Sequence, residues 1–452
     1  MTDRVVVVGG GMLGLVVALR LAQAGRPVTV LEAAGHVGGL ADAWVLEGPQ
    51  VAVTWDRHYH VTLASDTALR RVLRELGLEH LLCWRATRTG FWSGRRLVSV
   101  STPVDFLRLP GLSPGAKARV AATIAAGMRI RRWERLEQVP VEAWLARWSG
   151  RRTFERFWRP LLEAKLGSSW REANAAFIWA TIQRLSAARR AGLRREEFGY
   201  VPGGYATVLE RFAAHLRRLG VEVRTATPVT RVRAASDGLE VHLGAGAPVR
   251  AAAVVLTTTP ARAAGLVDGL RAAERHAWER IRYQGVVCVS LLLRRALSPY
   301  YLTYLFDEVP FTAVVEMTAL VDAAELGGYH LVYLPRYAAP TDELFTTDDA
   351  TITGRFLDGL RCVHPTLRDE EVVAARVSRA PEVFPIPVLG YSRLAPPVET
   401  SVPGVFLASS AQIVNGTLNV NETVTAAERA VPRVLAALAA GRPALGRLGA
   451  ER

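Results

Sequence analysis

Three glycines near the N-terminus have the spacing of a turn that binds a pyrophosphate. Gly9, Gly11 and Gly14 form a GxGxxG pattern, whose glycines allow a tight turn, a close approach of phosphate to the backbone, and close packing of a helix on a strand. The positive end of that helix then faces the phosphates. Glu32 lies 18 residues beyond Gly14, where a carboxylate can accept hydrogen bonds from an adenosine ribose and would repel the extra phosphate of NADP. The pattern therefore predicts a site for an adenine dinucleotide.

The surrounding sequence supplies the elements that must position this site. Residues 4–8 are predicted to form a buried strand, residues 13–24 an apolar helix ended by Gly25, and residues 28–32 a second strand. Asn419, with Glu422 three residues later, predicts the N-cap of a long final helix. The other elements expected in this part of the fold are a helix over 205–219 and strands over 221–224, 229–233, 239–243, 252–256 and 405–408.

Further signals follow in order along the chain. Glu32 is followed six residues later by Gly38-Gly39, and the segment Pro202-Gly203-Gly204-Tyr205 precedes Val229 and the C-terminal stretch from Ala408 to Glu428. With these motifs the chain resembles the FAD-dependent amine oxidases, protoporphyrinogen oxidases and phytoene desaturases, and more distantly UDP-galactopyranose mutase. The resemblance extends over nearly the whole sequence. It is most specific for a protoporphyrinogen-oxidase-like subgroup.

The resemblance implies an α/β fold with FAD as the cofactor. We expect a two-dinucleotide-binding (glutathione-reductase-like) FAD domain, a mixed α+β substrate domain and a helical insertion. The expected FAD domain is discontinuous, over 1–85, 198–275 and 395–440. A helical, basic lobe is expected over 86–197, the substrate domain over 276–394, and a disordered tail over 441–452.

Contacts with FAD can be assigned to individual residues through the same resemblance. Val229 would meet the adenine through its backbone, and the C-terminal strand and helix would place amides against the flavin. Two positions depart from the related sequences: Ser409-Ser410 stands where a carboxylate is common, and Leu40 replaces a basic residue. The residues expected to bind the cofactor are Gly9, Gly11, Met12, Leu13, Gly14, Glu32, Ala33, Gly38, Gly39, Leu40, Val229, Ser409, Ser410, Asn419 and Val420.

Candidates for the chemical step are fewer. Lys165 is one of two lysines in an arginine-rich chain, Lys117 being the other, and a pKa-tunable ammonium differs from a guanidinium. We predict that Lys165 contacts substrate or flavin, with an ordinary salt bridge as the alternative. His58, Tyr59 and His60 form a second candidate group, whose imidazoles could act as acid or base; a packing motif is the alternative. Phe384 and Tyr391 are weaker candidates for an aromatic wall, with core packing favoured.

Composition limits the remaining possibilities. The 452 residues are half hydrophobic, enough for two or three lobes, and no apolar run approaches the roughly 18 to 20 residues that cross a bilayer. We therefore expect a cytoplasmic protein. Three cysteines without paired spacing predict neither disulfides nor a metal site. No HExxH pair, P-loop or second GxGxxG occurs, so metallohydrolase and disulfide-reductase functions lack support.

The net charge of +14 is uneven, because residues 101–200 hold 19 basic and 9 acidic side chains. Such a field attracts anionic substrates, acidic lipids or nucleic acid, although an arginine-rich proteome would explain it equally well. Aromatic residues in this segment recur at helical spacing, which favours a core over nucleic-acid stacking. We expect a small or lipidic substrate and no nucleic acid; peripheral membrane contact and the oligomeric state stay open.

Three functions are compatible with these observations. The first is an FAD-dependent oxidoreductase that takes hydride from a substrate carbon and is reoxidised by oxygen or a quinone. The second is a redox-neutral flavoenzyme acting on a nucleotide- or lipid-linked sugar, and the third is a non-catalytic flavoprotein whose basic lobe docks on membranes. The first is favoured.

Overall fold

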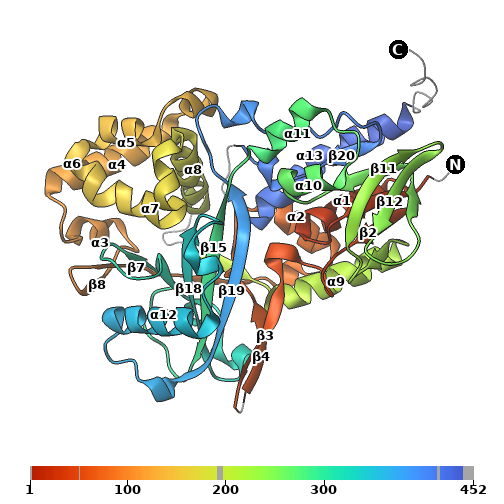
Figure 1. The fold of residues 1–452 in the computed structure, drawn as a ribbon. Helices are drawn as coiled ribbons and strands as arrows, with labels where there is room; N and C mark the ends of the chain where they lie inside the picture. The colour runs from red at the N-terminus through yellow and green to blue at the C-terminus, as the bar shows by residue number, and fades with distance from the viewer. Residues whose placement is uncertain (1–2, 50, 191–196, 415–417, 441–452) are drawn as a thin grey trace.

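The computed structural model describes residues 3–49, 51–190, 197–414 and 418–440. Figure 1 shows three parts: a lobe that contains both ends of the described chain, a large sheet in the middle, and a cluster of helices beyond it. We call them the dinucleotide lobe, the central sheet and the helical lobe. The expected tail over 441–452 lies outside the described residues.

The dinucleotide lobe is built on a parallel sheet whose strands come from distant parts of the sequence. All four residues of its central strand are buried valines, as expected for a parallel sheet covered on both faces. In the order β10-β2-β1-β14-β20, the strands are Glu222–Arg224, Val28–Leu31, Val5–Val8, Ala253–Leu256 and Val405–Leu407. The sheet confirms the predicted two-dinucleotide-binding fold.

The two faces of this sheet carry different layers. Val5 and Val7 pack on a helical layer, whereas Val6 and Val8 pack on a second, smaller sheet. The helices of the first layer are α1 (Met12–Gln23), α2 (Thr67–Glu75), α9 (Gly204–Arg218) and α13 (Val420–Ala439). The opposite layer contains β11 (Val229–Ala235), β12 (Gly238–Leu243), β13 (Val249–Ala251), α10 (Pro260–Leu266) and α11 (Ala272–Glu279).

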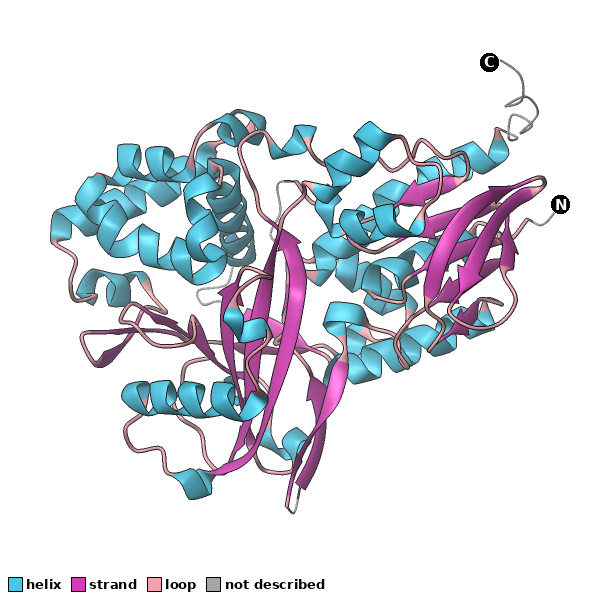
Figure 2. Cartoon of the chain, in the orientation of Figure 1, coloured by secondary structure: helices cyan, strands magenta, loops and turns pink. Residues whose placement is uncertain are grey.

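The central sheet has seven strands and separates the other two parts (Figure 2). Alternate residues of its long strand β15 face opposite sides: Val287 and Val289 pack under α12 (Asp349–Val363), whereas Cys288 and Leu292 face the core that includes Trp55. In the order β19-β15-β18-β17-β16-β7-β8, the strands are Val372–Pro385, Tyr283–Leu293, His330–Ala338, Ala313–Glu316, Leu302–Leu305, Thr89–Ser93 and Arg96–Ser99.

The helical lobe begins later than the sequence predicted. β7 and β8 fall inside the expected helical segment 86–197, but they extend the central sheet: β7 pairs with β16, and β8 pairs with β7. Phe91 packs in the core of the helical lobe and Trp92 in the core under α12, so this strand is buried on both faces. The helices are α3 (Pro103–Arg108), α4 (Pro114–Arg129), α5 (Val141–Ser149), α6 (Arg151–Thr153), α7 (Arg159–Leu166) and α8 (Ala175–Arg190), with a π-helical turn over Phe154–Trp158. Its aromatic residues are mostly core, as expected, but Trp148 is exposed.

Short strands connect the dinucleotide lobe to the central sheet. The hairpin β3 (Ala43–Gly48) and β4 (Val51–Asp56) leads from the second glycine pair toward β19, and Arg376 of β19 stacks on Trp44 of the hairpin. A small sheet of β5 (Thr62–Leu63), β9 (Glu197–Tyr200) and β6 (Cys83–Ala86) lies nearby. Within the described residues, no helix is long and apolar enough to cross a bilayer.

Candidate functional site

The glycine-rich turn joins β1 to α1. Gly11 is the N-cap of α1, and no side chain of the described residues caps this end, so the amides of Met12 and Leu13 in the first turn are left for a ligand. A Cβ atom on Gly14 would lie 2.0 Å from the carbonyl oxygen of Gly9. Only glycine therefore lets the helix start this close to the strand.

Glu32 fixes the outer side of the same turn. Its Oε2 accepts a hydrogen bond from the Gly10 amide at 2.6 Å, and its Oε1 accepts one from Ala34 at 2.8 Å. Gly38, at φ 132°, donates its amide hydrogen to the carbonyl of Gly10 at 2.9 Å. This hydrogen bond holds the Gly38-Gly39 pair against the glycine-rich turn. The carboxylate keeps lone pairs free for a ribose. Ala33, Gly39 and Leu40 are exposed at the rim.

Val229 lies close to Glu32 although nearly 200 residues separate them in sequence. The Thr227 amide donates to the carbonyl of Glu32 at 2.8 Å, and the Ala226 amide donates to that of Ala34 at 2.7 Å. Val229 starts β11 two residues later. The structure thus brings this residue to the side of the turn where the sequence predicted the adenine.

The C-terminal segment shows a helix N-terminus and a pair of serines. Asn419 caps α13, its Oδ1 accepting from the Glu422 amide at 3.1 Å, which confirms the predicted N-cap and leaves Val420 as the first helical residue. The hydroxyl of buried Ser409 accepts from the Ala411 amide within its own loop. Ser410 differs, because its Oγ lies 3.1 Å from Tyr283 Oη of β15. Ser409 therefore stabilises its own loop, and Ser410 connects this loop to the central sheet.

These features fit FAD. The uncapped start of α1 suits a pyrophosphate, Glu32 suits a ribose, and α13, which packs on α1, offers a second positive helix end. The observation that tests the fit is the close packing at Gly14, which brings the uncapped start of α1 directly against β1.

Lys165 lies in a half-buried polar cluster at the interface of α7 and the central sheet. Its Nζ donates to Tyr337 Oη at 2.6 Å and lies 3.9 Å from the centre of the Tyr337 ring and 5.3 Å from that of Phe384. Tyr59 Oη is 3.0 Å from Tyr337 Oη. No carboxylate within the described chain pairs with Lys165, so the alternative of an ordinary salt bridge is wrong.

Burial controls the ionisation of this cluster. It lowers the pKa of the Lys165 ammonium, an effect that Tyr59 opposes and Arg184 increases. It also raises the pKa of Tyr337 to about 12 and that of Tyr59 well above its usual value. Both phenols therefore stay protonated, and an anion placed beside Lys165 would stabilise its charged form.

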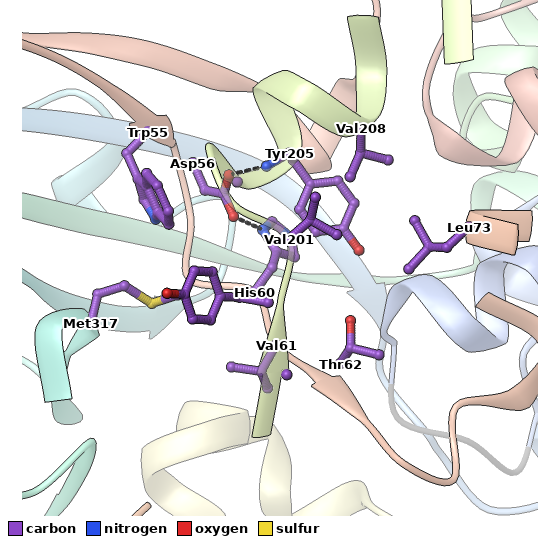
Figure 3. Close-up of a pocket in the computed structure, with 13 residues that line it drawn as sticks. Trp55, Asp56, His60, Val61, Thr62, Leu73, Val201, Tyr205, Val208 and Met317 are labelled. Carbon is purple, nitrogen blue, oxygen red and sulfur yellow. Dashed lines mark hydrogen bonds and ion pairs between the residues drawn. The ribbon is translucent and has the colours of Figure 1, made fainter. Parts of the chain in front are cut away.

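His60 and Tyr59 are adjacent in sequence but have different neighbours. The His60 ring lies 4.9 Å from that of Tyr205, and its Nδ1 is 3.6 Å from Asp56 Oδ2. Asp56 also accepts from the Tyr205 amide at 2.6 Å. Figure 3 shows these residues around a mostly apolar cavity of about 20 Å³, which has room for about one water molecule. The structure thus separates His60 from the Lys165 cluster.

His58 is ionised less readily than a free histidine. Burial lowers its pKa to about 3, with further repulsion from His60 and Arg57. An imidazole that stays neutral near pH 7 has no proton to donate, which argues against the predicted acid role for His58, whereas the base role stays a prediction.

A pH-dependent stability follows from His58. His58 is protonated near pH 6.5 in the unfolded chain but only near pH 3 in the folded chain. The free energy of unfolding is therefore highest above pH 6.5 and decreases as the pH falls toward 3. His58→Gln should remove up to about 1.4 kcal/mol per pH unit from that slope. Denaturant unfolding between pH 7.5 and 4.5 measures it, with exposed His276→Gln as the control. An unchanged slope in His58→Gln would show that His58 is protonated in the folded protein.

Sequence reasoning missed several residues of the cluster. Tyr337 and Gln284 lie on strands more than 100 residues from Lys165, and their types alone carry no signal. Phe384 lies beside Lys165 and Tyr337, whereas Tyr391 donates its hydroxyl to the carbonyl of Ala411 and is structural. The alternation of β15 and β19 was the only available indication that these side chains share a face.

The fold and the glycine-rich site define a dinucleotide-binding flavoprotein of the two-dinucleotide-binding class. The chain belongs to the flavin-containing amine oxidoreductase family, whose family model matches residues 13–435. It is an FAD-dependent oxidoreductase, as the sequence predicted.

Solved structures of related fold cover nearly the whole chain. A putative protoporphyrinogen oxidase from Exiguobacterium sp. 255-15 is 18% identical with a TM-score of 0.74, over 96% of this chain and 99% of its own. Putrescine oxidase bound to putrescine is 18% identical with a TM-score of 0.72, over 96% and 99%. Reduced UDP-galactopyranose mutase is 15% identical with a TM-score of 0.74, over 96% and 94%. At these identities the likeness concerns the fold.

Proposed function

We propose that the protein oxidises a small or lipidic substrate that lies against the central sheet, next to Lys165. The observation that carries this proposal is the Lys165 cluster: a half-buried ammonium whose hydrogen-bond partner is a neutral phenol, in contact with aromatic rings. Burying a charge without a counter-charge is costly, and such a group is characteristic of a functional site. FAD, when bound, supplies the acceptor for a hydride from the substrate.

The dinucleotide lobe holds the cofactor in this proposal. Glu32 accepts hydrogen bonds from the adenosine ribose, and Met12 and Leu13 donate their amides to the pyrophosphate. Val229 meets the adenine with its backbone. Asn419 and Val420 present the positive end of α13, which stabilises negative charge at the far end of the cofactor.

The central sheet and α7 hold the substrate. Tyr337 and Phe384 provide an apolar wall, and Lys165 and Tyr59 provide hydrogen-bond donors at its edge. Because the pKa of each phenol is raised, the tyrosines position groups and do not remove protons at neutral pH. The wall also excludes water from the reacting carbon.

Anaerobic reduction of the purified holoprotein tests the proposal. Candidate amines, tetrapyrroles and polyenes are added without oxygen, and a true donor is expected to bleach the visible flavin absorbance; air should restore it. Lys165→Met should slow the bleaching, and Lys117→Met, which removes the other lysine, should not. If no donor bleaches the flavin, but a sugar nucleotide is isomerised only after reduction with dithionite, the protein is a redox-neutral flavoenzyme and the proposal is wrong.

A further inference from the structure

Gln284 of β15 is buried without a hydrogen-bond partner. Gln284 is 1% exposed, and neither its Nε2 nor its Oε1 has a hydrogen-bond partner among the described residues. A buried primary amide that makes no hydrogen bond loses the full free energy of hydration of that group. A ligand that offers both an acceptor and a donor would remove this cost.

Gln284 shares its environment with Lys165. In the register of β15 and β19, Gln284 is opposite Phe384, and in the register of β15 and β18, Val286 is opposite Tyr337. The register of β15 and β19 shifts between Gln284 and Val286, but a Cβ on the intervening Gly285 would meet Phe345, which packs in the core under α12. The amide of Gln284 therefore lies on the opposite side, which is the side of the two rings that contact Lys165. A Cβ on Gly167, two residues after Lys165, would lie 3.5 Å from Gln284 Nε2.

The charged residues nearest to Lys165 do not neutralise it. Lys165 has no acidic partner in the described chain, and Arg184, which lies near enough to lower the pKa of Lys165, is itself paired with Asp66. A protonated amine placed between these residues would meet an ammonium in a buried setting, where like charges repel strongly. A carboxylate would instead form a charge-assisted hydrogen bond with Lys165 Nζ.

We propose that Lys165 and Gln284 together recognise a substrate that carries a carboxylate next to an N–H or O–H group, on an apolar body that packs against Tyr337 and Phe384. Lys165 Nζ and Gln284 Nε2 donate to the carboxylate, and Gln284 Oε1 accepts from the neighbouring N–H or O–H. This proposal names the substrate class of the proposed function, and it rests on that function. It also excludes protonated amines, in contrast to the substrate named for putrescine oxidase.

Three indole probes of similar size separate the two contacts. Indole-2-carboxylate carries both groups, 1-methylindole-2-carboxylate lacks the N–H, and 2-(aminomethyl)indole replaces the carboxylate by an ammonium. Each is titrated into the oxidised holoprotein while the visible flavin spectrum is recorded, so that binding is measured without turnover. We expect the first probe to bind at least tenfold more tightly than the second, and the third not to bind.

Two variants test which residue causes the preference for a carboxylate and which causes the preference for an N–H group. Lys165→Met should abolish the preference for carboxylate over ammonium, and Gln284→Leu should remove the difference between N–H and N-methyl while leaving FAD affinity unchanged. Lys117→Met and Ser290→Ala are matched controls, because Lys117 is buried in α4 and Ser290 is another buried, unpartnered polar residue on the same strand. Both controls should bind all probes as the unchanged protein does.

The same variants also show which results would overturn the inference. Gln284→Leu removes an unpartnered amide and should raise the melting temperature of the probe-free protein; if it fails to fold, Gln284→Met serves instead. Equal responses to carboxylate and ammonium probes, or a response to neither, would overturn the inference. So would a tenfold loss of FAD affinity in Gln284→Leu, since Gln284 would then bind the cofactor. Failure of all donors to bleach the flavin, with probe binding intact, would instead count against the proposed oxidation.

Discussion

Replacing Gly14 with alanine is expected to abolish the uptake of FAD. The added Cβ atom would lie 2.0 Å from the carbonyl oxygen of Gly9 and 3.0 Å from Thr257 Oγ1. The first of these atoms belongs to the backbone, so the start of α1 must move away from β1. Overpacking of this kind costs on the order of 3 kcal/mol, and the displaced helix no longer presents its amides to the pyrophosphate.

The measurement is the flavin content of the purified variant, together with its dissociation constant for added FAD. Gly35→Ala is the matched control, because a Cβ on Gly35 has no heavy atom within 4 Å although it lies in the loop after β2. The control should retain its flavin. An FAD-saturated Gly14→Ala protein with an unchanged melting temperature would mean that α1 does not start against β1 as described.

Replacing Glu32 with alanine should weaken FAD binding by a factor of about 10 to 100. Hydrogen bonds to a charged group contribute roughly 1.5 to 3 kcal/mol, and a tenfold change in affinity corresponds to about 1.4 kcal/mol. Part of the effect arises within the protein, because the carboxylate also accepts from the amides of Gly10 and Ala34. Fluorescence titration of the apoprotein with FAD measures the change.

FMN separates the two contributions of Glu32. FMN lacks the adenosine, so its weaker binding should be nearly the same in Glu32→Ala and in the unchanged protein. Glu222→Ala, on the neighbouring strand β10, removes a carboxylate that pairs with Arg4 and Arg224 and should leave FAD binding intact. If Glu32→Ala weakened FMN and FAD equally, Glu32 would support only the turn and would not bind the ribose.

The dinucleotide half of the site was predictable because its information is local. Gly9, Gly11, Gly14 and Glu32 lie within one strand–turn–helix–strand unit. At Gly9 and Gly14, a Cβ atom would collide with neighbouring atoms of the protein, so these two positions require glycine. Val229 was found only through the resemblance, since the backbone bonds that bring it to Glu32 leave no trace in side-chain type.

The substrate half was much less predictable. Lys165 could be identified because lysine is rare in this chain, but Tyr337 and Gln284 become its neighbours only through the pairing of β15, β18 and β19. The trio His58, Tyr59 and His60 was treated as one group, yet Tyr59 joins Lys165 while His60 packs on Tyr205. Which neighbours each of these side chains contacts depends on tertiary packing, and the periodicity of the sequence does not reveal tertiary packing.

Under the proposed function, the flavin of this oxidoreductase lies beside the Lys165 cluster, and the two-electron midpoint potential of the bound flavin tests this placement most directly. Two unit charges about 8 Å apart interact by roughly 2 kcal/mol at an effective dielectric constant near 20, and about 1.4 kcal/mol corresponds to 30 mV for two electrons. Removing the positive charge in Lys165→Met should therefore lower the potential by roughly 40 mV, with no change in Lys117→Met. Equal potentials in Lys165→Met and the unchanged protein would contradict the account.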